Sequence, residues 1–454
     1  MKISDLSYQY KAHPTVSQLA KLIKKESQAY LYGLSGSMDA VVAAGTILHL
    51  QHNHLFLLRD KEEAAYFHND LQNLIEGRDV YFFPSTFKRS VQFGQEDPTN
   101  IILRTGVLNA IKNYHESLVV SYPEALIEKV VKKQELARNT LEIHKGENIS
   151  TEFLNDVLFA YHFEQVDFVY EPGQFSVRGS IVDIFSFSDD HPYRIDFFGE
   201  EVESIRKFDV ANQLSIQNMS KAIIQPKLQN GLAGESAWQS FFEFLDTNTI
   251  VWVWDSEYIA TRIAALYDKT IEHHPNRNLE SYIIDRADFE EQLKQFHCIE
   301  SEYHGKPPQA NTLTYNTTPP PAFNKNFDLL SESLINNQKE GYTNYILSNN
   351  EKQIERLKSI FQDINPEVSF IPVTETLHEG FIDHELRLCC YTDHQIFGRY
   401  HKFQIKSGFS QKERLNLEEL NNLHPGDYVV HVDHGIGKFG GLDKIEVNGK
   451  KQEA

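Results

Sequence analysis

The sequence predicts a multidomain α/β protein. A parallel-sheet domain is split by an inserted α+β antiparallel meander, and a small α/β domain and the start of a small β-barrel follow. Three observations carry this prediction. Short apolar runs alternate with helical patterns over residues 29–130, the period becomes that of antiparallel strands after residue 149, and residues 426–439 are dense in glycine and β-branched side chains.

The chain has 454 residues, too many for one compact core, so several domains of about 100 to 150 residues are expected. The predicted parts are residues 1–118 and 213–335 for the parallel-sheet domain, 119–212 for the insertion, 336–402 for the small domain, 403–424 for a linker and 425–454 for the truncated barrel.

Composition narrows the functional classes. The formal net charge of −20 argues against broad electrostatic attraction to nucleic acid or to an anionic membrane. The chain has 3 cysteines, among them the adjacent Cys389 and Cys390, which fits a reducing compartment. The first residues lack a signal-peptide core, and no run of about 18 apolar residues occurs. We expect a cytoplasmic protein without a membrane partner.

The first apolar run leads through glycines into a helix, the layout of a phosphate-binding loop. A working loop continues with Lys, which reaches the β- and γ-phosphates, and Ser or Thr, which binds magnesium. This chain has Asp39 and Ala40 there. A carboxylate about 4 Å from a phosphate would cost roughly 4 kcal/mol at an effective dielectric of about 20. The sequence therefore predicts a degenerate loop that does not bind nucleotide, and an ordinary turn that needs small residues remains an alternative. Its residues are Gly33, Gly36, Ser37, Asp39 and Ala40.

Further apolar runs and helical patterns follow in alternation, which indicates a doubly wound parallel sheet. The strands are expected at residues 30–32, 55–58, 80–83 and 118–122, and the helices at 38–50, 62–75 and 101–111. The ligand crevice of such a sheet lies at the carboxyl ends of its strands, where the degenerate loop would lie.

The insertion is predicted as one helix and a meander of strands. The helix is expected at residues 153–163 and the strands at 166–170, 175–178, 181–187, 193–198 and 202–208. Strand alternation places Ser176 and Arg178 on one face. Because arginine and aromatic residues dominate binding hot spots, Arg178 with the nearby Phe185 and Tyr193 is a candidate interface anchor. A solvated arginine on the outer sheet face is the alternative.

After the insertion the α/β pattern returns. The apolar run at residues 250–254 ends in Asp255, like the strand that presents a magnesium-organising acid in P-loop enzymes, although buried strands often end in an acid. A small α/β unit is expected over residues 345–391. His431 and His434 would point to opposite faces of one strand, so no metal site is expected, and no catalytic residue is indicated.

Residues 175–185 and 193–205 strongly resemble a segment shared by two families of bacterial repair proteins, the excinuclease component UvrB and the transcription-repair coupling factors (Mfd). In both families it belongs to the domain that binds the excinuclease component UvrA. UvrB keeps an intact Lys-Thr loop, whereas the coupling factor has lost it. Residues 426–437 match the Gly-Asp/Gln-x-Val-Val-His-x-x-His-Gly-x-Gly opening of the coupling factor's CarD-like polymerase-interacting domain. The chain is therefore similar to the N-terminal half of a transcription-repair coupling factor with a UvrB-like module.

The resemblance implies a division of labour. The full-length protein would be an ATP-dependent translocase on double-stranded DNA that removes stalled RNA polymerase and recruits excision repair. ATP and magnesium would bind its absent C-terminal motor, and no cofactor is expected here. Within the UvrA-binding module, Arg178 matches the family motif and Phe185 is a neighbouring candidate. Contacts with the β subunit of RNA polymerase are expected from Lys444 and Ile445 on the second barrel strand.

Some residues depart from the family patterns. Related sequences often have arginine near Glu164 and Gln165, and UvrB often has one at Ser176. These departures leave the detailed contacts with UvrA open. A second hypothesis, based on the same fold and on Asp255, is a nucleotide-dependent, DNA-damage-engaging enzyme like UvrB. A third is direct binding of damaged DNA through Lys88 and Arg89.

Overall fold

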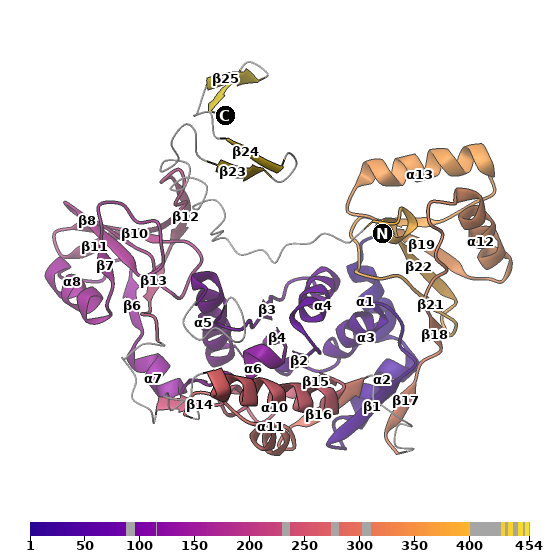
Figure 1. Ribbon diagram of the computed structural model, residues 1–454, viewed down its shortest axis with the longest axis horizontal. Helices are drawn as coiled ribbons and strands as arrows, with labels where there is room; N and C mark the ends of the chain where they lie inside the picture. The colour runs from indigo at the N-terminus through magenta and orange to yellow at the C-terminus, as the bar shows by residue number, and fades with distance from the viewer. Residues whose placement is uncertain are drawn as a thin grey trace.

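The computed structural model has a seven-stranded sheet at its centre (Figure 1). It describes residues 1–87, 96–114, 116–228, 237–273, 281–301 and 310–399 and the strands within 428–453. Across the sheet the strands are β17 (Thr312–Thr314), β1 (Gln28–Tyr32), β16 (His297–Ser301), β15 (Ile250–Trp254), β2 (His54–Leu57), β4 (Leu118–Ser121) and β3 (Val80–Phe82). All adjacent pairs are parallel, which confirms the predicted parallel-sheet domain.

Helices cover this sheet. They are α1 (Ser4–Lys11), α2 (Pro14–Leu22), α3 (Met38–Ile47), α4 (Lys61–Leu74), α5 (Pro98–Asn113), α6 (Pro123–Leu126), α7 (Lys133–Arg138), α9 (Phe241–Phe244), α10 (Ser256–His273) and α11 (Arg286–Leu293). Right-handed crossovers between parallel strands place α3 and α4 on one face and α5 and α10 on the other. Every residue of α3 except Asp39 is buried, because α1, α2 and α4 pack around it.

The inserted domain is entered and left through one antiparallel ribbon, β6 (Leu141–His144) with β13 (Lys221–Ile224). Its six-stranded sheet has the order β12 (Ser215–Met219), β11 (Glu201–Phe208), β10 (Tyr193–Phe198), β9 (Ile181–Ile184), β8 (Gln174–Arg178) and β7 (Glu164–Gln165). Helix α8 (Thr151–Ala160) packs on one face of this sheet through Leu154 and Leu158. The predicted α+β antiparallel unit is therefore present.

The predicted boundaries of the insertion, 119 and 212, are wrong. Strand β4 lies between β2 and β3 inside the parallel sheet, so the first part of the α/β domain continues past residue 118. The short strands β5 (Val130–Val131) and β14 (Trp238–Gln239) pair with each other outside the insertion. The inserted domain spans about residues 141–224, since its core contains Ile143 and Ile224.

The predicted strand at residues 166–170 is also absent. Strand pairing stops at Gln165, and the next residues form a strap across the sheet face opposite α8. The carbonyl of Asp167 accepts hydrogen bonds from Ser176 and Arg178. The side chain of Val169 in the strap is buried. The apolar residues suggested a strand, but Val166 and Val169 pack in a small cluster with Ile102 of α5, whereas Phe168 and Tyr170 are exposed.

A separate small cluster joins the inserted domain to the α/β domain. Phe185, Phe208 and Val169 pack there against Ile102 of α5. The side-chain amides of Asn109 on α5 and Gln225 exchange hydrogen bonds at 2.8 and 3.1 Å. The insertion is thus held by α5 as well as by its ribbon.

The small α/β domain has a mixed five-stranded sheet. Its order is β18 (Thr317–Thr318), β21 (Phe381–Asp383), β22 (Leu388–Thr392), β19 (Thr343–Leu347) and β20 (Ile371–Val373), and its helices are α12 (Phe327–Lys339), α13 (Glu351–Ile364) and α14 (Asp393–Ile396). The domain begins at about residue 316 rather than 336, because β18 belongs to its sheet and Leu330 of α12 to its core.

The C-terminal segment is described as two hairpins, β23 (Tyr428–His431) with β24 (Gly435–Lys438) and β25 (Lys444–Val447) with β26 (Lys450–Glu453). The predicted barrel stays a prediction. Lys88 and Arg89 lie outside the described residues. None of the described helices combines the length and apolarity needed to span a bilayer.

Candidate functional site

The predicted phosphate loop follows β1 at the carboxyl edge of the sheet, and other parts of the chain fill it. Gly33 and Gly36 both have positive φ, +81° and +57°. A Cβ at Gly33 would lie 2.2 Å from the carbonyl oxygen of Tyr315, and one at Gly36 would lie 2.3 Å from that of Gly380. The glycines thus allow two carbonyl groups to approach the loop, and a carbonyl oxygen repels the phosphate that such a loop would bind.

The residue in the lysine position makes structural contacts. The Oδ2 of Asp39 accepts a hydrogen bond of 3.0 Å from the indole nitrogen of Trp254, at the end of β15. Its Oδ1 accepts one from the backbone of Ala40. Asp39 therefore links the start of α3 to a neighbouring strand.

Ser37 is the centre of a buried polar cluster. Its hydroxyl donates to Oδ2 of Asp70 on α4 at 2.5 Å and accepts from the backbone N–H of Glu379 at 2.9 Å. The backbone N–H of His378 donates to Oδ1 of Asp70 at 2.8 Å. Ser37 lies two residues before Asp39, which has the position of the lysine in a working phosphate loop. Here Ser37 binds the small domain.

Asp70 is 2% exposed. Burial is the main cause that raises the pKa of its carboxyl to about 8, against the lowering effect of the hydrogen bonds from Ser37 and His378. The nearby Asp39 raises that pKa further. At neutral pH Asp70 is therefore mostly neutral, and the cluster does not add a second full negative charge beside Asp39.

Asp255 lies at the same edge of the sheet, as predicted, but it acts locally. Its Oδ1 accepts a hydrogen bond of 3.0 Å from the backbone N–H of Tyr258 in the first turn of α10. Its backbone has a left-handed φ of 61°. The side chain that reaches the loop comes instead from the preceding residue, Trp254.

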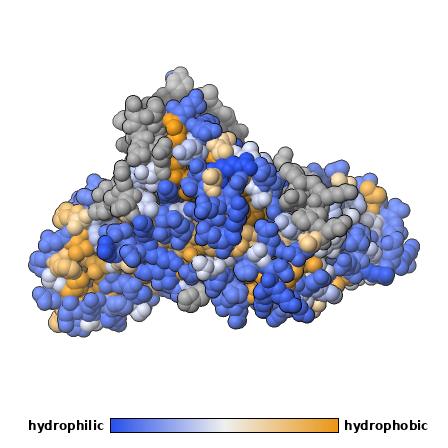
Figure 2. Space-filling model, turned by 90° about the horizontal axis from the view of Figure 1, so that it is seen from below, coloured by the Kyte–Doolittle hydropathy of each residue, from blue (hydrophilic) through white to orange (hydrophobic). Residues whose placement is uncertain are grey.

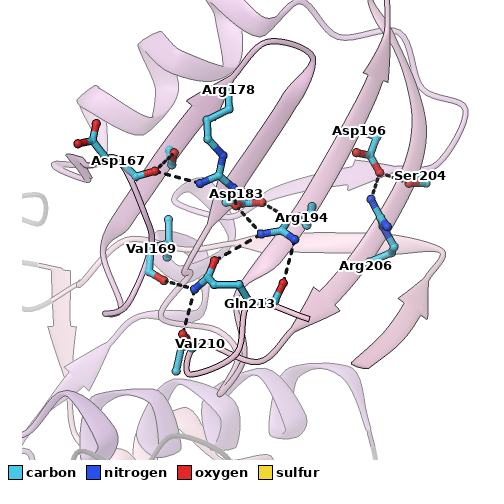
Figure 3. Close-up of polar contacts among 11 residues, drawn as sticks. Asp167, Val169, Arg178, Asp183, Arg194, Asp196, Ser204, Arg206, Val210 and Gln213 are labelled. Atoms are coloured by element: carbon cyan, nitrogen blue, oxygen red, sulfur yellow. Dashed lines mark hydrogen bonds and ion pairs between the residues drawn. The ribbon is translucent and has the colours of Figure 1, made fainter. Parts of the chain in front are cut away.

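A second candidate site lies on the inserted domain, on the sheet face opposite α8. Asp183 on β9 is 0% exposed and binds two arginines (Figure 3). Arg194 on β10 donates to both of its carboxylate oxygens at 2.8 and 2.9 Å, and Arg178 on β8 donates to Oδ2. Two cations around one buried anion leave a local positive charge on a strongly acidic chain.

Arg178 is the member of this triad that reaches the surface. Its side chain is 35% exposed. It lies over the ring of Phe168, 4.9 Å from the centroid, and donates to the carbonyl of Asp167 at 3.0 Å. Figure 3 shows the Asp167 carboxylate pointing away from the guanidinium. The guanidinium is held in one orientation with one edge toward solvent.

Arg194 fixes the neighbouring loop. It donates to the carbonyl of Gln213 at 3.1 Å and lies over the ring of Phe208. Its hydrogen bonds with Asp183 raise its pKa, so its charge is secure. The Gln213 side chain in turn donates to the carbonyls of Val210 and Val169, which joins this loop to the strap (Figure 3).

Exposed apolar side chains lie on the strap, on the loop after β11 and on β12. Phe168, Tyr170, Leu214 and Ile216 are between 44% and 66% exposed. Figure 2 shows hydrophobic residues at the left end of the molecule, where the inserted domain lies, and this domain also exposes Phe153 and Phe159 of α8. A fixed arginine in contact with an exposed aromatic ring, as Arg178 is with Phe168, is typical of a protein-binding surface. We call Arg178, Phe168, Tyr170, Leu214 and Ile216 the arginine face.

The predicted aromatic neighbours of Arg178 are wrong. Phe185 is fully buried against α5, and Tyr193 packs in the core on the α8 side, so neither lies on the arginine face. Ser176 and Arg178 do share a face, as predicted, because both donate to the carbonyl of Asp167. Glu164 and Gln165 are exposed on β7.

Lys444 and Ile445 lie on β25, the third described strand of the C-terminal segment rather than the second. Their role in binding polymerase stays a prediction. Among the described residues, Asp189, Asp190 and His191 have metal-like spacing, but Asp189 already binds Lys207 and Tyr193.

Sequence reasoning missed Asp183, Arg194 and Phe168. An acid between Val182 and Ile184 in an apolar strand was a usable signal, since a buried carboxylate needs cationic partners. Nothing in the sequence indicated that Phe168 would pack on an arginine, because residues 166–170 were expected to form a strand.

Comparisons with known proteins agree with this arrangement. The family model described as the UvrB interaction domain matches residues 141–229, and the one described as the CarD-like/TRCF RID domain matches residues 423–454. A transcription-repair-coupling factor of Bacillus subtilis (strain 168) is 24% identical and aligns with 92% of this chain and 42% of its own length. One from Staphylococcus haemolyticus (strain JCSC1435) is 23% identical over 91% of this chain and 42% of that protein.

The fold and these matches define a multidomain α/β protein in which a module similar to the UvrB interaction domain is inserted into a parallel-sheet domain. A polymerase-interaction-type segment follows at the end of the same chain. The chain is similar to an N-terminal part of the transcription-repair coupling factors. It spans 42% of the length of the Bacillus subtilis relative.

Proposed function

We propose that this chain is the recruitment part of a transcription-repair coupling factor, and that the arginine face binds the excinuclease component UvrA. The observation that carries the proposal is the Asp183 triad, which fixes Arg178 against the exposed ring of Phe168 within the segment that matches the UvrB interaction domain. The C-terminal hairpins would contact RNA polymerase. Translocation on double-stranded DNA, with ATP and magnesium, would belong to the remainder of a longer protein.

Arg178→Ala is expected to weaken binding of purified UvrA by about 2 kcal/mol or more, which is roughly 30-fold in Kd. The guanidinium would be lost together with its cation–π contact to Phe168, which would free the strap. Isothermal titration of the folded variant measures this change.

Arg286→Ala is the matched control. Arg286 is 40% exposed and ion-paired, but it lies on α11 in the α/β domain. Arg206→Ala, at a similarly exposed arginine on β11, maps how far the interface extends. Equal affinities of the Arg178→Ala variant and the parent chain would remove the arginine face from the proposal.

The alternative function is a nucleotide-dependent enzyme like UvrB, suggested by the parallel sheet and Asp255. We expect no calorimetric heat from this chain at millimolar ATP, with UvrB as the positive control. Asp39→Lys should not create ATP binding either, because the carbonyls of Tyr315 and Gly380 occupy the loop. ATP binding by either the parent chain or this variant would favour the enzyme.

A further inference from the structure

A segment of the small domain fills the degenerate phosphate loop of the same chain. The backbone N–H groups of His378 and Glu379 bind Asp70 and Ser37, and the Gly380 carbonyl lies against Gly36. The ring of His378 stacks on that of Tyr66 on α4, with 3.5 Å between the centroids. The segment 376–380 thus enters the place where a phosphate would bind in an active relative of this fold.

Further polar contacts join the same two domains. The hydroxyl of Tyr10 on α1 donates to Oδ2 of the buried Asp383 at 2.5 Å. The amide of Asn73 on α4 donates to the carbonyl of Thr376 at 3.1 Å. Buried hydrogen bonds of this kind are lost together if the domains separate, which leaves their polar groups without partners.

The apolar contact is continuous as well. Val373, Leu377 and Phe381 of the small domain are fully buried in the same core cluster as α1, α3 and α4. The ring of Phe381 meets that of Tyr10 edge to face, with the centroids 6.4 Å apart. The small domain has its own second core, around Leu330, Leu357 and Tyr391. Separation of the domains would expose the shared core but leave this second one.

We propose that the small domain is the built-in occupant of the former phosphate loop, so that the small domain and the α/β domain unfold as one cooperative unit. The small domain then replaces a bound nucleotide as the element that holds the loop, α3 and α4 in place. This role concerns the stability of the chain and does not depend on UvrA.

The chain carries a separate native probe in each domain. Its 3 tryptophans, Trp238, Trp252 and Trp254, all lie in the α/β domain. The buried thiols of Cys389 and Cys390 lie in the small domain, and a Cys298→Ala background removes the third cysteine. Through a urea titration, tryptophan fluorescence therefore follows the α/β domain, the reactivity of Cys389 with a disulfide reagent follows the small domain's own core, and that of Cys390 follows the shared core.

The experiment compares Gly36→Ala with Gly77→Ala in this background. Both glycines have positive φ, but a Cβ at Gly36 meets the Gly380 carbonyl whereas nothing lies within 4 Å of one at Gly77. We expect coincident transitions of the two probes in the background protein. Gly36→Ala should shift both probes to lower urea by the same amount and speed the thiol reaction in water by at least about tenfold, and Gly77→Ala should do so much less.

Two results would overturn the proposal. One is thiol exposure at lower urea than the tryptophan transition in the background protein. The other is a Gly36→Ala effect confined to the tryptophans. If Gly36→Ala does not fold, Ser37→Ala serves instead, because it removes only the hydroxyl that binds Glu379 and Asp70. Faster thiol reaction in Ser37→Ala supports the proposal, and an unchanged rate contradicts it.

Discussion

Asp183→Ala is expected to lower the unfolding free energy of the inserted domain by about 3 to 5 kcal/mol, because removal of one partner from a buried ion pair leaves uncompensated charge. Arg194 and Arg178 would both lose their carboxylate. The loop at Gln213 and the strap at Asp167 would then lose their anchors, so affinity for UvrA should fall as well. Hydrogen exchange at the backbone N–H groups of β9 and β10 measures the free energy of opening.

The control for this prediction is Asp196→Ala. Asp196 is 18% exposed and binds Arg206 and Ser204 on the same sheet face. It holds a single arginine, so its loss should cost only about 1 kcal/mol. Exchange in β15 should remain unchanged in both variants. Similar losses from the two variants would show that the Asp183 triad is not the anchor of this sheet.

Asp70→Asn is expected to stabilise the chain increasingly as the pH rises from about 4 to about 8. The folded protein holds a proton on Asp70 up to a pKa of about 8, whereas the unfolded chain releases it near the ordinary value of 3.8. Folding of the parent chain therefore takes up a proton in this window, and its stability falls with rising pH by about 1.4 kcal/mol per pH unit from this group. Above pH 8 the contribution is constant.

Asparagine fits the same place without titrating. Its carbonyl can accept from His378 and its amide can donate to Ser37. The titratable and charged groups around this site are Asp39 near the start of α3, Tyr66 on α4 and His378 and Glu379 of the small domain. Urea unfolding at pH 5, 6, 7 and 8 should give curves for the two proteins that diverge with pH.

Ser37→Ala is the control for this pH dependence. It keeps the carboxyl that titrates and removes one hydrogen bond to it, so stability should fall at every pH while the slope remains. Parallel pH profiles for Asp70→Asn and the parent chain would contradict a protonated Asp70 in the folded protein.

Local patterns predicted the elements well. The fully apolar run at residues 250–254 predicted a buried strand, which is β15. The alternation along residues 175–178 predicted a strand with two different faces, which is β8. The domain boundaries failed, because β5 and β6 are short strands whose partners lie about 80 to 110 residues later. Pairing at such distance leaves no periodic signal in either segment.

The sites show the same limit. Asp39 in a glycine-rich turn was enough to predict a degenerate loop, but nothing local indicated that Gly380 would fill it. Phe185 was assigned to the surface because it lies near Arg178 in the sequence. It follows β9, and the chain there turns toward α5, which the sequence does not show.

Because β6 pairs with β13, the inserted domain is a self-contained unit, here called the cassette, that could be transferred as a whole. Leu141 and Ile224 are paired with each other, so the cassette's two ends lie side by side where it leaves its host. A host needs only two adjacent attachment points to accept it, and the cassette brings its own core with it. Recombination could therefore move the inserted domain, with its arginine face, as one unit between host domains.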